Sequence, residues 1–185
     1  KFFARLTKSA LPIFVKGGDI SAGTMAVGYH EDYLVKFFQS NADVGINDFF
    51  IDIGANIGLM SCQVGTQFTE VHMYEPNPLL VKILDVNTQL MLEGNSTIYA
   101  VGLGSKEGSF HLSIPKNNWG GAFINNGDNS YSADQLMRKD GYSQYNPKNY
   151  ISLNIQVREV ITEMNSLFSD LKARGLNRGC VKIDV

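Results

Sequence analysis

Two strand-like runs joined by a glycine-rich turn and a short helix most constrain the fold of this 185-residue chain. The first run, Phe49–Ile53, is aromatic and β-branched, which is typical of a buried strand. The turn Gly54–Gly58 follows, and the breaker-free apolar segment Leu59–Val64 predicts a helix. The second run, Val71–Tyr74, predicts the next strand. The segment is therefore one strand–helix–strand unit.

The same pattern then repeats. Asn77 is a suitable cap for a helix whose first residue is Pro78, and that helix ends near Gly94. Ser96–Val101 predicts a third strand. Strands and helices that alternate in this way predict an α/β fold, with a parallel sheet, right-handed crossovers and helices on both faces.

The second half of the chain is less regular. Phe110–Ile114 and Ile151–Val157 alternate as hairpin-like strands do, and Val181–Val185 predicts a last buried strand. Between the first two lies Pro115–Tyr150, rich in Asn, Gly, Ser and Tyr, with one weak helical patch. Val160–Ala173 predicts a helix whose inward-facing residues are Ile161, Met164, Phe168 and Leu171.

Composition limits the class of partner and the compartment. The 16 basic and 18 acidic residues give a net charge of -2, whereas a nucleic-acid binder would be strongly basic, so no nucleic-acid partner is expected. No apolar stretch reaches the roughly 18 residues of a membrane span, so no membrane partner is expected either. Cys62 and Cys180 both lie in apolar surroundings and are interpreted as buried thiols, which favours a cytoplasmic location.

The predicted strands end in residues that suit ligand binding. Ligands of open α/β sheets bind at the carboxyl ends of the strands, where this chain has Asp52–Gly58, Glu75, Gly102 and Asp184. The spacing from Asp52 to Glu75 fits one strand–helix–strand unit. It puts an acid where a ribose presents two hydroxyls, and Glu75 could accept a hydrogen bond from both.

The glycine turn discriminates between ribose-bearing cofactors. It lacks the third glycine of the dinucleotide pattern G-x-G-x-x-G, and Asp52 before it would repel a phosphate. An acid there better suits a cation, such as an amino or sulfonium group. S-adenosylmethionine combines a ribose, an amino-acid portion and no phosphate. Gly54 and Gly58 would let the backbone approach it closely, and Asn56 tolerates the left-handed conformation of such turns.

Four motifs in order resemble the FkbM-type methyltransferases, a branch of the Rossmann-like, S-adenosylmethionine-dependent methyltransferases. They are FIDIGANIG at 50–58, MYEPNP at 73–78, AVG at 100–102 and VKIDV at 181–185, and the resemblance runs from about Tyr29 to the end. It implies that the turn lines the methionine and ribose, that Glu75 holds the ribose hydroxyls, and that Val101 flanks the adenine. The cofactor-binding residues expected are Asp52, Gly54, Ala55, Asn56, Gly58, Glu75, Pro76, Val101, Gly102 and Asn118.

Two residues are candidates for a catalytic role. The resemblance places Asp184 near the methyl group, where it would orient the substrate hydroxyl; binding a metal and capping the next turn are the alternatives. His30 begins the helix expected over the cofactor entrance. His72 lies within a strand and is interpreted as a packed, hydrogen-bonded imidazole. No His, Asp and Glu cluster has metal-ligand spacing, so no metal is expected.

The resemblance also sets the expected architecture, a Rossmann-like three-layer sandwich with a mostly parallel sheet and a β-hairpin insertion. In the family VKIDV continues into further strands, so we expect about four parallel strands, with the C-terminal half of the fold missing. Residues 47–185 would form this incomplete core. Residues 1–46 would form an N-terminal helical segment over the cofactor site, with a helix from Tyr29 to Gln39 whose apolar stripe is Tyr33, Leu34, Phe37 and Phe38.

These observations predict an enzyme that moves the methyl group of S-adenosylmethionine to a hydroxyl on a small molecule or sugar. Oxygen as the acceptor atom is implied by the resemblance alone. One alternative is a non-catalytic binding or assembly module that retains the cofactor pocket, and another is an NAD-linked oxidoreductase. An exposed last strand would invite pairing with a second chain, which leaves a homo-oligomer open.

Structural roles remain open for several of these residues. Gly54 and Gly58 could serve a tight turn without a ligand, and Asp52 could accept backbone N–H groups of the same turn. The aromatic residues of the irregular segment could stack on a substrate or pin the segment to the body; they are Trp119, Tyr131, Tyr142, Tyr145 and Tyr150.

Overall fold

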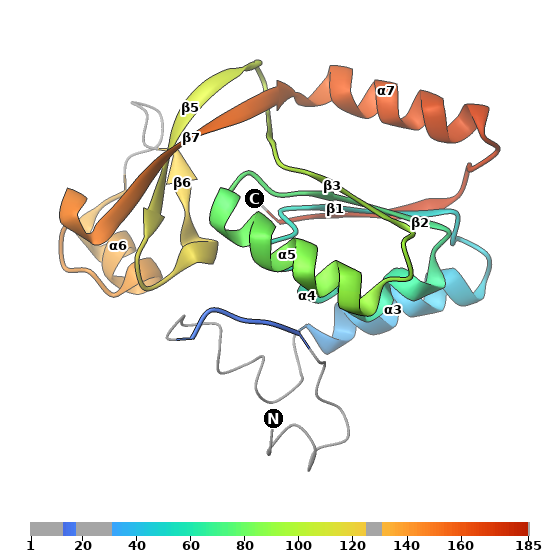
Figure 1. The fold of residues 1–185 in the computed structure, drawn as a ribbon, viewed down its shortest axis with the longest axis horizontal. Helices are drawn as coiled ribbons and strands as arrows, with labels where there is room; N and C mark the ends of the chain where they lie inside the picture. The colour runs from blue at the N-terminus through green and yellow to red at the C-terminus, as the bar shows by residue number, and fades with distance from the viewer. Residues whose placement is uncertain (1–12, 18–30, 125–130, 185) are drawn as a thin grey trace, which may run out of the picture.

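The structure, a computed structural model, describes residues 13–17, 31–124 and 131–184. Figure 1 shows a sheet with helices on both faces and a second sheet beyond one end of it. This is the α/β, mostly parallel, Rossmann-like arrangement that the sequence predicts, and the predicted fold class is confirmed.

The first sheet is entirely parallel. Its strands are β1 (Phe49–Ile53), β2 (Glu70–Tyr74), β3 (Ser96–Tyr99) and β8 (Gly179–Ile183), in the order β3-β2-β1-β8. The chain therefore moves outward from β1 to β3 and then returns to the other side of β1. Such a change of direction leaves a crevice at the carboxyl ends of the central strands, which is where open α/β sheets bind ligands.

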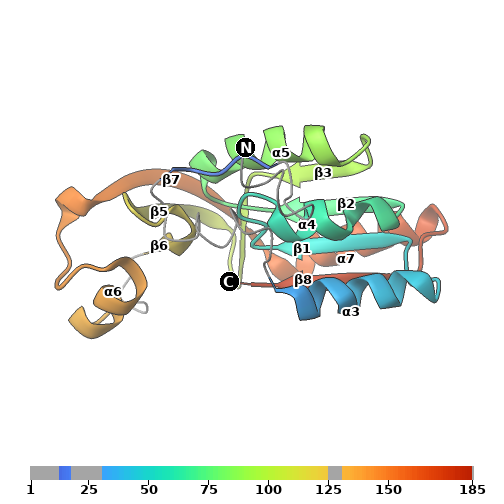
Figure 2. The same cartoon turned by 90° about the horizontal axis from the view of Figure 1, so that it is seen from below.

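Helices cover both faces of this sheet. On one face lie α3 (Asp32–Asp43), α4 (Leu59–Val64) and α5 (Pro78–Met91), and α7 (Val160–Ala173) lies on the other (Figures 1 and 2). The predicted start of α5 is confirmed, because the Asn77 side chain accepts a hydrogen bond from the next turn and Pro78 is the first helical residue.

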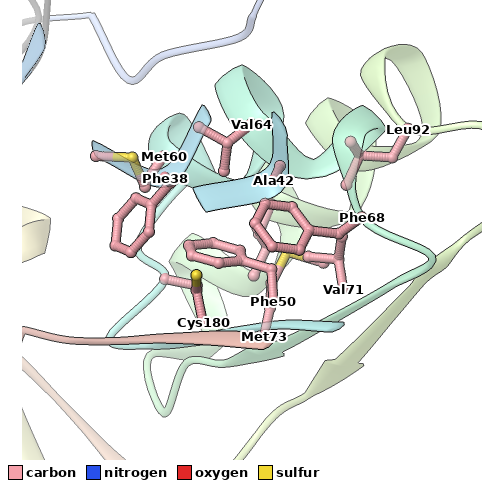
Figure 3. Packing of buried hydrophobic residues seen from close by; sticks show 12 residues of the cluster. Phe38, Ala42, Phe50, Met60, Val64, Phe68, Val71, Met73, Leu92 and Cys180 are labelled. Carbon is pink, nitrogen blue, oxygen red and sulfur yellow. The ribbon is translucent and has the colours of Figure 1, made fainter. Parts of the chain in front are cut away.

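The side chains of β1 alternate between two apolar cores. Phe50 faces α3 and α4 and packs edge to face against Phe38, with ring centroids 4.9 Å apart (Figure 3). Ile51 points the other way, toward Leu167 and Leu171 of α7. Because both faces of β1 are buried, the strand is apolar almost throughout, and its one charged residue requires a specific explanation.

The second sheet is mixed. Its strands have the order β4-β7-β5-β6, and the two strands that the sequence predicts as hairpin-like pair antiparallel as β5 and β7. The remaining elements are β4 (Gly102–Gly104), β5 (Gly108–Pro115), β6 (Phe123–Ile124), α6 (Ala133–Asp140) and β7 (Tyr150–Glu159), with short 3₁₀ turns at Gly65–Gln67, Trp119–Gly121 and Pro147–Asn149. The weak helical patch is α6, which begins with a capping box of Ser132 and Gln135.

Three expectations need correction. The third strand ends at Tyr99 rather than Val101, because Gly102 pairs with Val157 in the second sheet. In α7, Ile161 and Phe168 are 67% and 39% exposed, and Leu167 faces inward instead. In α3, Tyr33 and Phe37 of the predicted stripe are exposed, whereas Leu34 and Phe38 of that stripe, together with Val35 and Ala42, pack in the core over β1.

Strand β8 occupies one edge of the parallel sheet. The prediction of a buried strand here is wrong for its apolar residues: Val181 and Ile183 are exposed at this edge, and Cys180 is the buried residue of β8, in the core that Figure 3 shows. Both cysteines are free, buried thiols, as the sequence predicts. Within the described ranges, no helix has the length and apolar character that crossing a bilayer requires.

Candidate functional site

Two turns meet at the carboxyl edge of the parallel sheet. The first follows β1 and contains three left-handed residues, Gly54, Asn56 and Gly58, with φ of 78°, 54° and 82°. The left-handed conformation expected of Asn56 is confirmed, and asparagine adopts it at lower cost than most side chains. The second turn follows β2 and contains Glu75 and Asn77, the cap of α5.

The Glu75 carboxylate joins these two turns. It accepts a hydrogen bond from the backbone N–H of Asn56 at 2.8 Å through one oxygen, and from the N–H of Asn77 at 2.8 Å through the other. The residue is 6% exposed. An ionised carboxylate offers about four acceptor positions, so roughly two stay available to further donors. A vicinal diol supplies donors in that number.

Burial raises the pKa of Glu75 to about 7, and the charge of Asp52 adds to the rise. The N–H groups of Asn77 and Asn56 and the ammonium of Lys182 act in the opposite direction. The carboxyl group is therefore poised to change its charge near neutral pH. Additional hydrogen-bond donors favour the ionised form.

This pKa predicts a pH-dependent stability. The folded-state pKa lies above the unfolded value of 4.5, so the protein loses stability as pH rises from about 4.5 through 7. Glu75→Gln has no carboxyl group to titrate at this position. The free energy of unfolding of the variant minus that of wild type should therefore increase by about 3 kcal/mol from pH 4.5 to pH 8. Urea denaturation at the two pH values measures this difference.

Glu70→Gln is the matched control, because ion pairing with Arg174 lowers the pKa of Glu70. The stabilising effect of Glu70 is present at neutral pH and lost as pH falls, so its variant should lose stability relative to wild type at pH 8. If the free energy of unfolding of Glu75→Gln differs from that of wild type by the same amount at both pH values, the raised pKa of Glu75 is contradicted.

Asp52 is the charged residue of β1, and it is fully buried. The hydroxyl of Ser61 donates to one of its oxygens at 2.7 Å, and the Lys182 ammonium lies 3.2 Å from the other. The sequence predicts that Asp52 faces a cation of the cofactor, whereas the cation beside it in the structure is Lys182. Sequence reasoning missed Lys182, although its opposite charge within VKIDV was the available signal.

The two glycines of the first turn make room for the protein's own backbone and helix. A Cβ at Gly54 would overlap the carbonyl oxygen of Asp184, and a Cβ at Gly58 would lie 2.6 Å from the Leu84 side chain on α5. Both φ values are positive as well. The glycines thus let β8 and α5 close around the turn, which is the tight-turn role that the sequence left open.

The loop around Trp119 covers both turns. The Asn77 side chain donates to the Trp119 carbonyl at 3.0 Å, and Gly120 lies against the side chain of Asn56. The Asn118 amide is engaged elsewhere in the loop: it donates to the Lys139 carbonyl at 3.0 Å and to Asp140 at 3.3 Å, and it accepts from the N–H of Gly121 at 3.1 Å. Sequence reasoning missed Asn77 as the residue that holds this loop.

The tyrosines of the irregular segment pack on one another. Tyr145 stacks on Tyr150 with ring centroids 5.0 Å apart, and Tyr131 packs edge to face on Phe123. Tyr142 also contacts Tyr150 edge to face. Of the two roles left open for these rings, the structure favours pinning the segment to the second sheet.

The remaining predicted residues are distributed around the site. Ala55 packs into the core beneath α4, and Val101 packs against the core beneath α7. Gly102 lies beside Pro76, with its missing Cβ 3.6 Å from that ring. The Asp184 side chain is 71% exposed and lies 3.6 Å from the Lys182 ammonium. His30 lies outside the described residues.

Other titratable groups have structural roles. His72 contacts the hydroxyl of Tyr99 at 3.2 Å and Glu70 at 3.1 Å, which confirms the packed imidazole that the sequence predicts. Burial, with the Asp52 charge, raises the pKa of the Cys62 thiol to about 12, so it is no nucleophile at neutral pH. Among the described residues, no group of three or more His, Cys, Asp and Glu side chains could hold a metal.

Residues 13–17, one of the two described stretches of the N-terminal segment, lie beside the site. The buried Asn87 amide accepts from the N–H of Phe14 at 2.6 Å and donates to the Ile57 carbonyl at 2.8 Å. Lys16 lies over the Trp119 ring, 5.0 Å from its centroid. Ile13 packs with Trp119 against the apolar cluster that includes Ile57, so this short stretch contacts both the glycine turn and the Trp119 loop.

Comparisons with known proteins give structural likenesses only. No family model matches the chain, and no curated protein does. Precorrin 8w decarboxylase from Methanobacterium thermoautotrophicum is 22% identical over 39% of each chain, with a TM-score of 0.33. P. horikoshii TYW2 in complex with MeSAdo is 13% identical over 78% of this chain and 64% of its own, with a TM-score of 0.31.

Methyltransferase FkbM from Methylobacillus flagellatus KT is 14% identical over 66% of this chain and 35% of its own, with a TM-score of 0.29. The chain thus spans less than two thirds of the length of each of these three structures. Likeness at this level does not extend to activity or substrate.

Proposed function

We propose that this chain is an S-adenosylmethionine-dependent methyltransferase that acts on a hydroxyl group of a small molecule or sugar. The observation that carries the proposal is the buried Glu75 carboxylate at the end of β2. Its two oxygens each hold one backbone N–H, from Asn56 and Asn77, and each retains acceptor capacity for one ribose hydroxyl.

The charges at this edge favour this cofactor over a dinucleotide. Asp52, Glu75 and Asp184 are acidic, and Lys182 lies within 4 Å of two of them. A pyrophosphate would face net negative charge and a turn without the third glycine of the dinucleotide pattern. A ribose with a sulfonium group and no phosphate meets neither obstacle.

Methyl transfer from an activated donor requires few catalytic groups of the protein. Held at Glu75, S-adenosylmethionine would supply an activated methyl group for transfer to the acceptor oxygen, and its neutral thioether would be the leaving group. The chain must hold the two reactants in line and receive the hydroxyl proton. Asp184, exposed at the end of β8, is the candidate to orient that hydroxyl, and the Trp119 loop is the candidate to exclude water.

Turnover tests this proposal. The protein is incubated with S-adenosylmethionine and a panel of hydroxylated sugars and small molecules, and release of S-adenosylhomocysteine is followed by mass spectrometry. We expect acceptor-dependent release that Asp184→Asn slows. Cofactor binding without release from any acceptor would favour the non-catalytic module, and reduction of added NAD would favour the oxidoreductase.

A further inference from the structure

Lys182 lies at the candidate site but has no role in the ribose contacts proposed for Glu75. It pairs in register with Asp52 on the neighbouring parallel strand, and its ammonium lies 3.2 Å from Asp52 and 3.6 Å from Asp184. Its side chain is only 10% exposed. A lysine so nearly buried is uncommon unless it is paired, so its position between the two acids is specific.

The charge of Asp52 makes this lysine necessary. Asp52 is fully buried, and its side-chain partners among the described residues are the Ser61 hydroxyl and this ammonium. A buried carboxylate that loses its cation leaves an uncompensated charge in a medium of low dielectric. Together, Asp52, Glu75 and Asp184 carry three negative charges when ionised, and Lys182 cancels one of them.

The two forms of the cofactor differ in charge at one atom. The methyl donor has a sulfonium, whereas the product has a neutral thioether of nearly the same shape. Net negative charge at the candidate site therefore favours the donor over the product, and a positive charge there reduces that preference. A preference for the donor that is too weak would let the product compete for the site.

We propose that Lys182 is a specificity-determining residue, which sets how strongly this site prefers the cationic methyl donor over the neutral product. The inference rests on the proposed function. Lys182 cancels the charge of Asp52 and leaves Glu75 and Asp184 to act on the sulfonium. In this proposal Asp52 forms an ion pair with Lys182 and does not bind the cofactor directly.

A series of charge variants tests the proposal by titration calorimetry with S-adenosylmethionine and S-adenosylhomocysteine. Lys182→Met makes the site more negative by one unit, and Asp52→Asn makes it more positive by one. Lys182→Arg and the double variant Asp52→Asn/Lys182→Met keep its net charge. Titrations at pH 9 and low salt keep Glu75 ionised in wild type and in Lys182→Met, because its pKa is about 7 and loss of the Lys182 charge raises it further. Low salt limits screening.

The quantity to compare is the ratio of the dissociation constant of the product to that of the donor. One unit charge within about 10 Å at an effective dielectric near 20 changes this ratio on the order of tenfold. We expect Lys182→Met to raise the ratio by roughly that factor and Asp52→Asn to lower it. Lys182→Arg and the double variant should keep it within about twofold of wild type.

Failures of the two proposals are distinguishable. If wild type binds neither ligand, the proposed function fails and this inference fails with it. If wild type binds both and all variants share one ratio, Lys182 has a structural role only, however much the individual affinities fall. Lys182→Met could fail to fold because it leaves Asp52 buried without its cation. In that case Asp52→Asn and the double variant, which removes both charges of the pair, show whether the ratio follows the net charge or stays constant.

Discussion

Glu75→Ala should weaken the binding of S-adenosylhomocysteine by roughly 10- to 100-fold at pH 8. The substitution removes the acceptors proposed for the ribose diol, and it leaves the N–H groups of Asn56 and Asn77 without their partner. Stranding hydrogen-bonding groups in a buried site costs about 1–3 kcal/mol. Titration calorimetry of both proteins measures the difference.

The control variants separate this effect from loss of fold. Glu70→Ala alters the first residue of the same strand, where the carboxylate pairs with Arg174 far from the two turns, so its affinity should match wild type. Glu75→Gln keeps one acceptor oxygen and should fall between wild type and alanine. Equal affinities for wild type and Glu75→Ala would exclude Glu75 from the cofactor site.

Gly54→Ala should lower the free energy of unfolding by roughly 3–5 kcal/mol, near the upper limit for single substitutions. The new Cβ would overlap the Asp184 carbonyl oxygen, which is rigid backbone next to β8, and the residue would have to keep a φ of 78°. The turn cannot move aside, because the N–H groups of Gly54 and Ala55 both donate to the Tyr74 carbonyl. Urea denaturation measures the loss.

Gly94→Ala is the matched control for the steric part of this loss. Gly94 has a similar φ of 82°, and a Cβ there would meet nothing within 4 Å. Its substitution should therefore cost only the strain of the left-handed backbone, about 1 kcal/mol. Equal losses for the two variants would show that β8 does not press against the turn at Gly54.

Local signals predicted the parts of the fold that depend on neighbours in sequence. Strand β1, helix α4 and helix α7 have the bounds expected from their apolar runs, and α5 begins at its Asn77 cap. These elements are specified by patterns a few residues long. The capping box of α6 was a similar local signal, and it would have turned a weak helical patch into a firm prediction.

Long-range contacts account for what the sequence did not predict. Gly102–Gly104 forms a strand only because β7, some 50 residues later, lies beside it. Ile161 and Phe168 match the helical period of α7, but the sheet beneath that helix places Leu167 inward and leaves them exposed. Periodicity identifies the apolar residues of a helix, whereas the depth of each depends on the partner surface.

In the candidate site, too, features set by local sequence could be predicted and features set by long-range contacts could not. The position of Glu75 and the left-handed Asn56 could be predicted, because short sequence patterns identify strand ends and turn residues. The pairing of Asp52 with Lys182 spans 130 residues, and the Asn77 contact to Trp119 spans 42. The charge of Lys182 marks it as a candidate partner for an acid, but which residues pair in either case depends on how the strands and loops assemble.

A crystal structure of the protein with S-adenosylhomocysteine is the most direct test of the central claim that Glu75 holds the ribose of this cofactor. We predict both ribose hydroxyls within about 3 Å of the Glu75 oxygens, with the Asn56 and Asn77 contacts retained. A ligand bound elsewhere, or a ribose turned away from Glu75, would contradict the claim.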